Sequence, residues 1–174
     1  YSYYEGKAMS LDEVMAEVER LGCDLVELTG GEPLLQKELP ELARRLLAKG
    51  ATVLCETGGH RDISVLPAGV IRIMDIKCPA SGESGKNLWS NVAHLNSHDE
   101  VKCVVADKAD FDWAVERIRE HGIEGRVRTI LFSPVHGQCD PKALAGWVLE
   151  SGLENSRMQL QLHKYVWGAD ATGV

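Results

Sequence analysis

The chain has 174 residues, of which 44% are hydrophobic and 26% are charged, a composition typical of a soluble globular domain. Its 26 acidic residues outnumber its 19 basic residues, and the net charge of −7 argues against binding along a nucleic-acid backbone. No stretch is apolar for long enough to span a bilayer, and residues 1–5 lack a signal-peptide pattern. The sequence therefore favours one cytoplasmic domain, residues 1–174, that recognises a small molecule and neither nucleic acid nor a membrane.

Helices and strands are predicted to alternate along the chain. Ser10 and Glu13 form a capping box, which begins a helix that ends at Gly22. Hydrophobic periodicity then predicts strands at residues 24–28, 51–56, 70–77, 100–106, 127–132 and 158–165, and helices at residues 38–49, 110–121 and 141–150. This alternation predicts an α/β fold with a parallel sheet, either open or curled into a barrel.

The five cysteines are widely separated and form no zinc, redox or disulfide pattern. Cys23, Cys55 and Cys103 lie in or beside apolar strand-like runs, so we expect buried, unreactive thiols there. Reduced thiols fit a cytosolic protein.

Two segments that follow predicted strands have the composition of binding loops. Thr29, Gly30, Gly31 and Glu32 come directly after the first strand, where glycines let the backbone approach a ligand and a carboxylate can bind an ammonium or hydroxyl group. Residues 78–90 are polar and glycine-rich, and they follow the end of another strand. Ligands of parallel α/β folds collect at the carboxyl ends of strands, so both segments are predicted to border a binding site.

Other polar residues are predicted to lie at the same edge of the sheet. They are Glu56 to Gly58, Asp75, Lys77, Ser133, His136, Gln159, Gln161, His163 and Lys164. Alternation in the last predicted strand places Gln159, Gln161 and His163 on one face, where they can recognise a ligand. Each residue also has a structural alternative: Glu56 and Asp75 can cap helices or pair with Lys77, and His163 can be a core histidine.

Four segments together resemble the radical S-adenosylmethionine family of 7-carboxy-7-deazaguanine synthases. They are Leu-Thr-Gly-Gly-Glu-Pro-Leu-Leu-Gln at residues 28–36, Glu-Thr-Gly-Gly at 56–59, Asp-Ile-Lys-Cys-Pro at 75–79, and Gln-Leu-Gln-Leu-His-Lys-Tyr-Val-Trp at 159–167. The Gly-Gly-Glu motif is shared across the superfamily, whereas the third and fourth segments narrow the match. The resemblance covers nearly the whole chain.

The resemblance implies a partial (β/α)6 barrel, a homodimer and a carbon–nitrogen lyase of queuosine biosynthesis. Members convert 6-carboxy-5,6,7,8-tetrahydropterin to 7-carboxy-7-deazaguanine with S-adenosylmethionine, a four-iron, four-sulfur cluster, Mg²⁺ and a reductant such as flavodoxin. Substrate binding is implied for Thr29, Gln161, His163 and Lys164. S-adenosylmethionine binding is implied for Gly30, Gly31, Glu32, Glu56, Asp75, Ile76, Lys77, Ser133, Pro134, Val135 and His136.

One feature departs from the family pattern. The three cluster cysteines and the magnesium-binding threonine of the family are expected upstream of Tyr1, together with the first barrel strand. None of the five cysteines has the spacing to replace them, so we expect the chain as written to be incomplete for catalysis. Three alternatives stay open: a cluster-free module that binds the pterin or S-adenosylmethionine, a structural subunit, and another radical enzyme such as a glycyl-radical activase.

Overall fold

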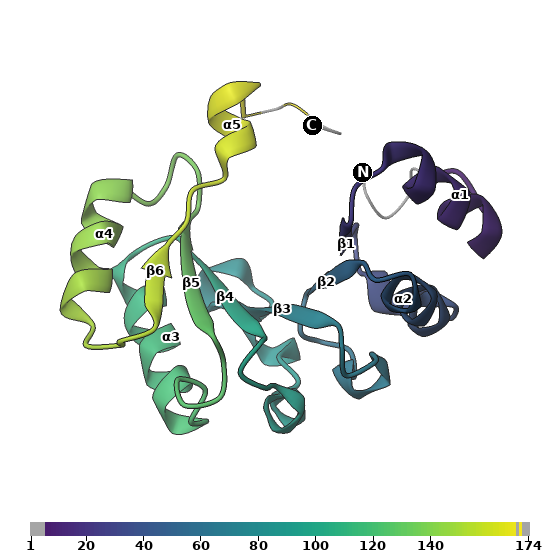
Figure 1. The fold of residues 1–174 in the computed structure, drawn as a ribbon. Helices are drawn as coiled ribbons and strands as arrows, with labels where there is room; N and C mark the ends of the chain where they lie inside the picture. The colour runs from purple at the N-terminus through teal and green to yellow at the C-terminus, as the bar shows by residue number, and fades with distance from the viewer. Residues whose placement is uncertain (1–5, 170, 172–174) are drawn as a thin grey trace.

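The computed structural model describes residues 6–169 and 171. Within them, six parallel strands form one sheet in the order of the sequence (Figure 1). The strands are β1 (Leu25–Leu28), β2 (Thr52–Thr57), β3 (Ile71–Lys77), β4 (Glu100–Val105), β5 (Thr129–Pro134) and β6 (Ser156–Met158). The α-helices are α1 (Leu11–Leu21), α2 (Leu39–Ala48), α3 (Lys108–Glu120), α4 (Pro141–Glu150) and α5 (Leu162–Val166). The predicted α/β class with a parallel sheet is confirmed.

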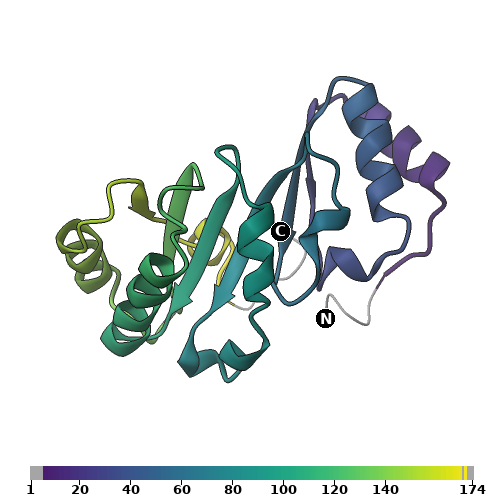
Figure 2. The same ribbon diagram turned by 90° about the horizontal axis from the view of Figure 1, so that it is seen from below.

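The six strands follow an arc, and helices α1 to α4 lie on its outer, convex side (Figure 1). Helices α1 and α2 cover one end of the sheet, and α3 and α4 cover the other, as the rotated view shows (Figure 2). Helix α5 lies beyond the carboxyl ends of β5 and β6. The concave side of the sheet is therefore left without a covering helix among the described residues.

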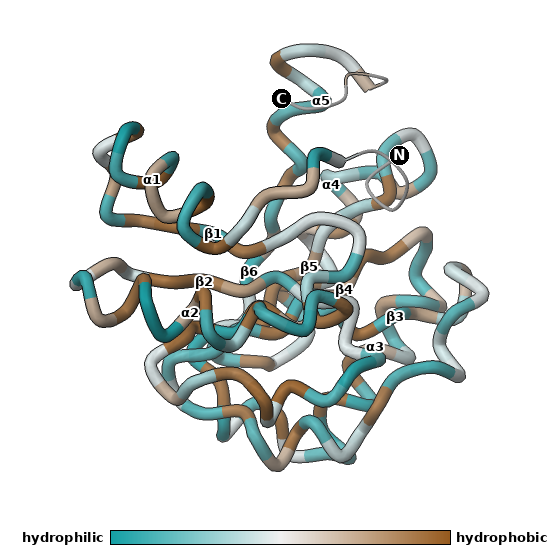
Figure 3. The backbone as a smooth tube through the Cα atoms, turned by 90° about the vertical axis from the view of Figure 1, so that its right-hand side faces the viewer, coloured by the Kyte–Doolittle hydropathy of each residue, from teal (hydrophilic) through white to brown (hydrophobic). Residues whose placement is uncertain are grey.

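The two faces of the strands differ in burial: the hydrophobic core lies between the convex face of the sheet and the helices that cover it. Outward residues such as Val53, Cys55, Val101 and Cys103 are fully buried, and they form two apolar clusters with the helices. Hydrophobic and hydrophilic residues are interspersed along the chain, because each element contributes one apolar face (Figure 3). The inward face of the central strands carries charged side chains, including Lys102.

Most predicted elements are confirmed with small shifts at their ends. The capping box of α1 is present: the Glu13 backbone N–H donates to Ser10 Oγ at 3.3 Å, and the Ser10 backbone N–H donates to Glu13 Oε2 at 2.7 Å. Helix α4 has the predicted bounds. Strand β1 pairs with β2 alone among residues 6–169 and 171, and Leu25 is 59% exposed.

The prediction of a strand at residues 158–165 is wrong. Strand β6 ends at Met158, and residues 162–166 form helix α5. The Gln159 backbone N–H donates to the Phe132 carbonyl at 2.9 Å, and the next donor of this ladder would be the backbone nitrogen of Pro134, which carries no hydrogen. Pairing with β5 therefore stops there, and Leu162, the first residue of α5, is 66% exposed.

Candidate ligand-binding site

Two adjoining pockets lie at the carboxyl ends of the strands. The first has a volume of about 740 Å³ and is lined by Thr29, Gly30, Gly31, Glu56, Thr57, Gly58, His60, Arg61, Asp75, Lys77, Glu83 and Lys86. The second, of about 470 Å³, is lined mainly by residues of β3, β4 and the segments that follow them. Asp75 and Lys77 line both pockets. The two pockets therefore meet at the end of β3.

The turn after β1 leaves room for a ligand against the backbone. Gly30 has a φ of +134°, a conformation that side chains rarely allow. A Cβ built on Gly30 would have no heavy atom of the protein within 4 Å, so its open side faces free space. With Thr29 and Gly31 it forms one wall of the first pocket. This turn can therefore present backbone groups to a bound molecule.

Glu32 connects this turn to the end of β2. Its side chain is 0% exposed, and it accepts hydrogen bonds from the Thr57 hydroxyl at 2.9 Å and from the Gly58 backbone N–H at 2.9 Å. It also accepts from the Leu34 backbone N–H at 3.1 Å and lies 3.5 Å from His60 Nδ1. Glu32 is not among the residues that line either of these two pockets. The structure thus places its carboxylate behind the pocket wall, where it fixes two pocket-lining turns.

Asp75 and Lys77 form an ion pair where the pockets meet. The Lys77 ammonium lies 2.6 Å from Asp75 Oδ2, which is the pairing that sequence reasoning left open as an alternative. The Oδ1 atom is buried and has no hydrogen-bond donor among the described residues. Burial raises the pKa of the Asp75 carboxyl group, and the nearby Lys77 opposes this shift. This oxygen lies 3.4 Å from the Lys102 ammonium, so it has an ionic partner although no donor makes a hydrogen bond to it.

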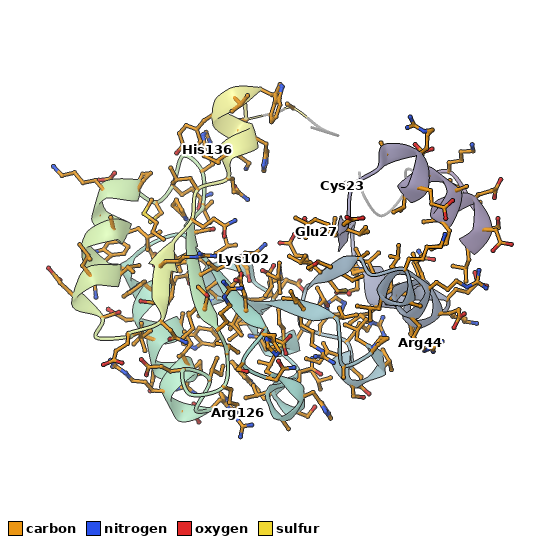
Figure 4. All side chains as sticks on the ribbon, viewed as in Figure 1. Cys23, Glu27, Arg44, Lys102, Arg126 and His136 are labelled. Atoms are coloured by element: carbon orange, nitrogen blue, oxygen red, sulfur yellow. The ribbon has the colours of Figure 1, made fainter. Side chains whose placement is uncertain are left out.

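Lys102 is a charged residue of the site that sequence reasoning missed. It projects from β4 to the concave side, towards the region into which Glu27 of β1 also points (Figure 4). Its ammonium forms an ion pair with Glu56 and lies 3.4 Å from Asp75 Oδ1. Burial lowers the pKa of the Lys102 ammonium, and the negative charge of Glu27 opposes this. A lysine between the buried residues Val101 and Cys103 was a signal that could have identified it.

The remaining predicted residues divide into two groups. Ile76, Val135 and Gln161 line the second pocket, and Pro134, His136 and Gln161 line a third pocket of about 170 Å³. Ser133 is buried, whereas His163 and Lys164 are half-buried residues of α5, and these three residues line none of the three pockets. Glu32, Lys77 and His163 were predicted to lie together at the edge of one binding site. Of these three residues, only Lys77 lines a pocket.

Residues from loops complete the pocket walls, and sequence reasoning did not assign them. His60 and Arg61 follow β2, while Glu83 and Lys86 lie within residues 78–90, the loop that was predicted to border a binding site. Asp110 of α3 accepts hydrogen bonds from the Ala80 backbone N–H at 2.9 Å and the Ala106 backbone N–H at 3.1 Å. It thereby holds this loop against the second pocket. A polar run after a strand marked the loop, but not its individual contacts.

The described cysteines do not fit an iron–sulfur cluster. Cys55, Cys78, Cys103 and Cys139 are buried, and Cys23 is exposed in the turn before β1, which contradicts the expectation that it is buried. Burial raises the pKa of the Cys55 thiol to about 12, whereas cluster ligands are thiolates that converge on one point. Among residues 6–169 and 171, no three cysteine, histidine or acidic side chains are placed to hold a metal ion.

Comparison with known proteins gives the class and then the family. Residues 1–148 match the model of the radical SAM superfamily, so the chain belongs to this class. It is 44% identical over 188 residues to the 7-carboxy-7-deazaguanine synthase of Koribacter versatilis, covering 100% of this chain and 83% of that protein. It is also 44% identical over 177 residues to that of Chlorobaculum tepidum, covering 100% and 80%. The chain belongs to the 7-carboxy-7-deazaguanine synthase family.

A more distant relative shows how far the likeness extends within the superfamily. GTP 3′,8-cyclase 1 of Mycobacterium tuberculosis is 31% identical over 106 residues, which are 53% of this chain and 28% of that protein. The match to the synthases thus covers far more of the chain. The described helices include none with the length and hydrophobicity needed to cross a membrane.

Proposed function

We propose that the protein catalyses the ring contraction of 6-carboxy-5,6,7,8-tetrahydropterin to 7-carboxy-7-deazaguanine, a carbon–nitrogen lyase step of queuosine biosynthesis. Substrate and product differ by one ammonia, so the reaction breaks a carbon–nitrogen bond. The family assignment supports this proposal, and so do the two pockets that meet at the ion pair of Asp75 and Lys77. This junction of the two pockets is the single structural observation on which the proposal depends most.

S-adenosylmethionine is proposed to lie across the pockets. Its amino-acid end would occupy the first pocket beside Gly30 and Gly31, where the acidic groups of Glu56 and Asp75 can accept hydrogen bonds from its ammonium group. Lys77 can pair with its carboxylate, and Glu32 would hold the turns that surround it. The adenosine end would extend past Ile76 to residues 133–136. When bound, this cofactor supplies the radical that starts the chemistry.

The pterin is proposed to bind on the concave side of the sheet next to the cofactor. Thr29 lines the first pocket and Gln161 lines the second, so either residue can contact the pterin directly. An amide such as that of Gln161 both donates and accepts hydrogen bonds, which suits the polar edge of a pterin. His163 and Lys164 are proposed to contact substrate from the segment of α5. Because neither lines a pocket, their contribution depends on how α5 sits when the substrate is bound.

The remaining requirements of the family are part of the same proposal. The superfamily uses a four-iron, four-sulfur cluster, and we propose that cysteines other than the five of this chain hold it. We also propose a Mg²⁺ ion that organises the substrate, an external reductant such as flavodoxin, a homodimer, a cytoplasmic location and a partial (β/α)6 barrel. The curvature of the sheet is compatible with such a barrel (Figure 1).

The test is product formation by the full-length protein with a reconstituted cluster. Under anaerobic conditions it is mixed with S-adenosylmethionine, a reductant and the pterin, and the products are analysed by mass spectrometry. We expect a product that is lighter than the substrate by one ammonia. Asp75→Asn should abolish it, while Asp112→Asn, in an exposed ion pair of α3, should not. No such product from the wild-type protein would refute the proposal.

A second function is favoured by the cysteines that do not fit a cluster: this chain alone is a binding module for the cofactor or the pterin. Calorimetric titration of the 174-residue chain separates the two. If the 174-residue chain binds either ligand and the full-length protein shows no turnover, the binding-module function is supported. If the full-length protein shows turnover, the enzyme function is supported.

A further inference from the structure

Lys102 occupies an unusual position for a lysine. It lies in the middle of a central strand, opposite Asp75 in the register of β3 and β4, and its side chain is only 17% exposed. The residues on either side of it, Val101 and Cys103, are fully buried. A lysine held in such a place loses most of its hydration, which costs free energy that an apolar residue would not cost.

The ammonium of Lys102 joins three strands. It forms an ion pair with Glu56 of β2, reaching across β3, and it lies 3.4 Å from Asp75 Oδ1. Asp75 Oδ2 is already paired with Lys77 at 2.6 Å. Asp75 is therefore held between two ammonium groups, and its contact with Lys102 is an ion pair without a hydrogen bond.

The two carboxylates that Lys102 contacts belong to the proposed ligand site. Glu56 lines the first pocket, Lys102 lines the second, and Asp75 lines both. Lys102 pairs with Glu56 through Oε1, so the other oxygen of Glu56 is left without a hydrogen bond among the described residues. A single ammonium group thus contacts one oxygen atom of each carboxylate.

We infer that Lys102 is a positioning residue of the proposed reaction: its ammonium holds the carboxylates of Glu56 and Asp75 in the orientation in which they accept hydrogen bonds from the donor groups of bound S-adenosylmethionine. This inference rests on the proposed function and adds a residue to it. Lys102 acts through the two carboxylates and not through a contact of its own with the cofactor. Without it, the two negative groups repel each other and lose their fixed orientation.

The test measures the dissociation constant of S-adenosylmethionine by calorimetry, with the full-length protein and its reconstituted cluster. Lys102→Met should weaken binding about tenfold, because a hydrogen-bonding contact to a charged group is disturbed. Lys102→Arg keeps the charge and should recover most of the affinity. Lys108→Met removes a lysine from an exposed ion pair of α3 and should leave binding unchanged.

A double-mutant cycle tests whether Lys102 acts through Glu56. If it does, Glu56→Gln combined with Lys102→Met weakens binding no more than the larger of the two single changes. This double variant also removes one charge of each sign; where Lys102→Met alone does not fold, its affinity is compared with that of Glu56→Gln, and equal affinities support the inference. Unchanged affinity in the Lys102 variants, or losses that multiply in the double variant, would overturn the inference. If the wild-type protein does not bind S-adenosylmethionine, the proposed function is overturned as well.

Discussion

Replacing Gly59 by alanine is expected to damage both the fold and the site. Gly59 follows β2 with a φ of +73°, and a Cβ at this position would lie 2.3 Å from the backbone carbonyl oxygen of Asp75. Contacts under 3.0 Å essentially never occur for real Cβ atoms, so the turn at Gly59 and the backbone of β3 must move apart. That backbone carries the carboxylate at which the two pockets meet.

The magnitude follows from two separate costs. A positive φ at a non-glycine residue costs about 1–2 kcal/mol, and overpacking against a fixed neighbour adds about 1–3 kcal/mol. Gly122→Ala is the matched control, because Gly122 has a φ of +61° and open space around its Cβ position. We therefore expect Gly59→Ala to lower the free energy of unfolding by about 2–5 kcal/mol and Gly122→Ala by about 1–2 kcal/mol.

Urea denaturation followed by circular dichroism measures both changes. Gly59→Ala should also weaken binding of S-adenosylmethionine under conditions where it is still folded, whereas Gly122→Ala should not. Equal losses of stability in the two variants would show that the close approach to Asp75 is relieved without cost, and the reasoning would be refuted.

Three further predictions concern the interior. Asp99 is fully buried, lies 3.4 Å from the Arg72 guanidinium and accepts a hydrogen bond from the Arg72 backbone N–H at 2.8 Å. Asp99→Ala should therefore lower the free energy of unfolding, measured by urea denaturation, by about 3–5 kcal/mol. A decrease of less than about 1 kcal/mol would contradict this. With a thiol reagent at pH 8, exposed Cys23 should react first, while Cys55, with a pKa of about 12, should react only on unfolding; fast modification of Cys55 in the native protein would count against its burial. The pKa of Asp75 in the folded state lies above its ordinary value of 3.8, so ionisation of this group disfavours the folded state. As the pH rises above about 4, Asp75→Asn should therefore become more stable than the wild type, while losing activity. A difference in the free energy of unfolding that does not change with pH would be inconsistent with this.

Most of the fold could be predicted because the sequence signals for each helix and strand lie within that element. The capping box of α1, the apolar stripe of α2 and the β-branched strands are signals contained within a few residues, and the structure confirms them. The end of β6 was mispredicted because it depends on a neighbour: Pro134, in another strand, lacks the donor that the ladder needs. Strict alternation at residues 157–163 is local evidence, and it cannot indicate where a partner strand ends.

The site shows the same division between local and long-range information. Gly30, Asp75 and Lys77 were recognised because each lies at a strand end, and the structure brings them to the same pair of pockets. Lys102 was missed because its role comes from Glu56, which is 46 residues away in the sequence. Glu32 was expected to face a ligand, but it is saturated by donors from its own chain, including the Thr57 hydroxyl, which no sequence pattern announces.

The central claim is that the two pockets joined at Asp75 and Lys77 hold S-adenosylmethionine beside the pterin. A crystal structure of the full-length protein with both molecules bound tests it most directly. We predict electron density for the amino-acid end of the cofactor against Gly30 and Gly31, with its ammonium group within hydrogen-bond distance of Glu56 or Asp75. Density for the cofactor elsewhere, with Asp75 Oδ1 still without a donor, would contradict the account.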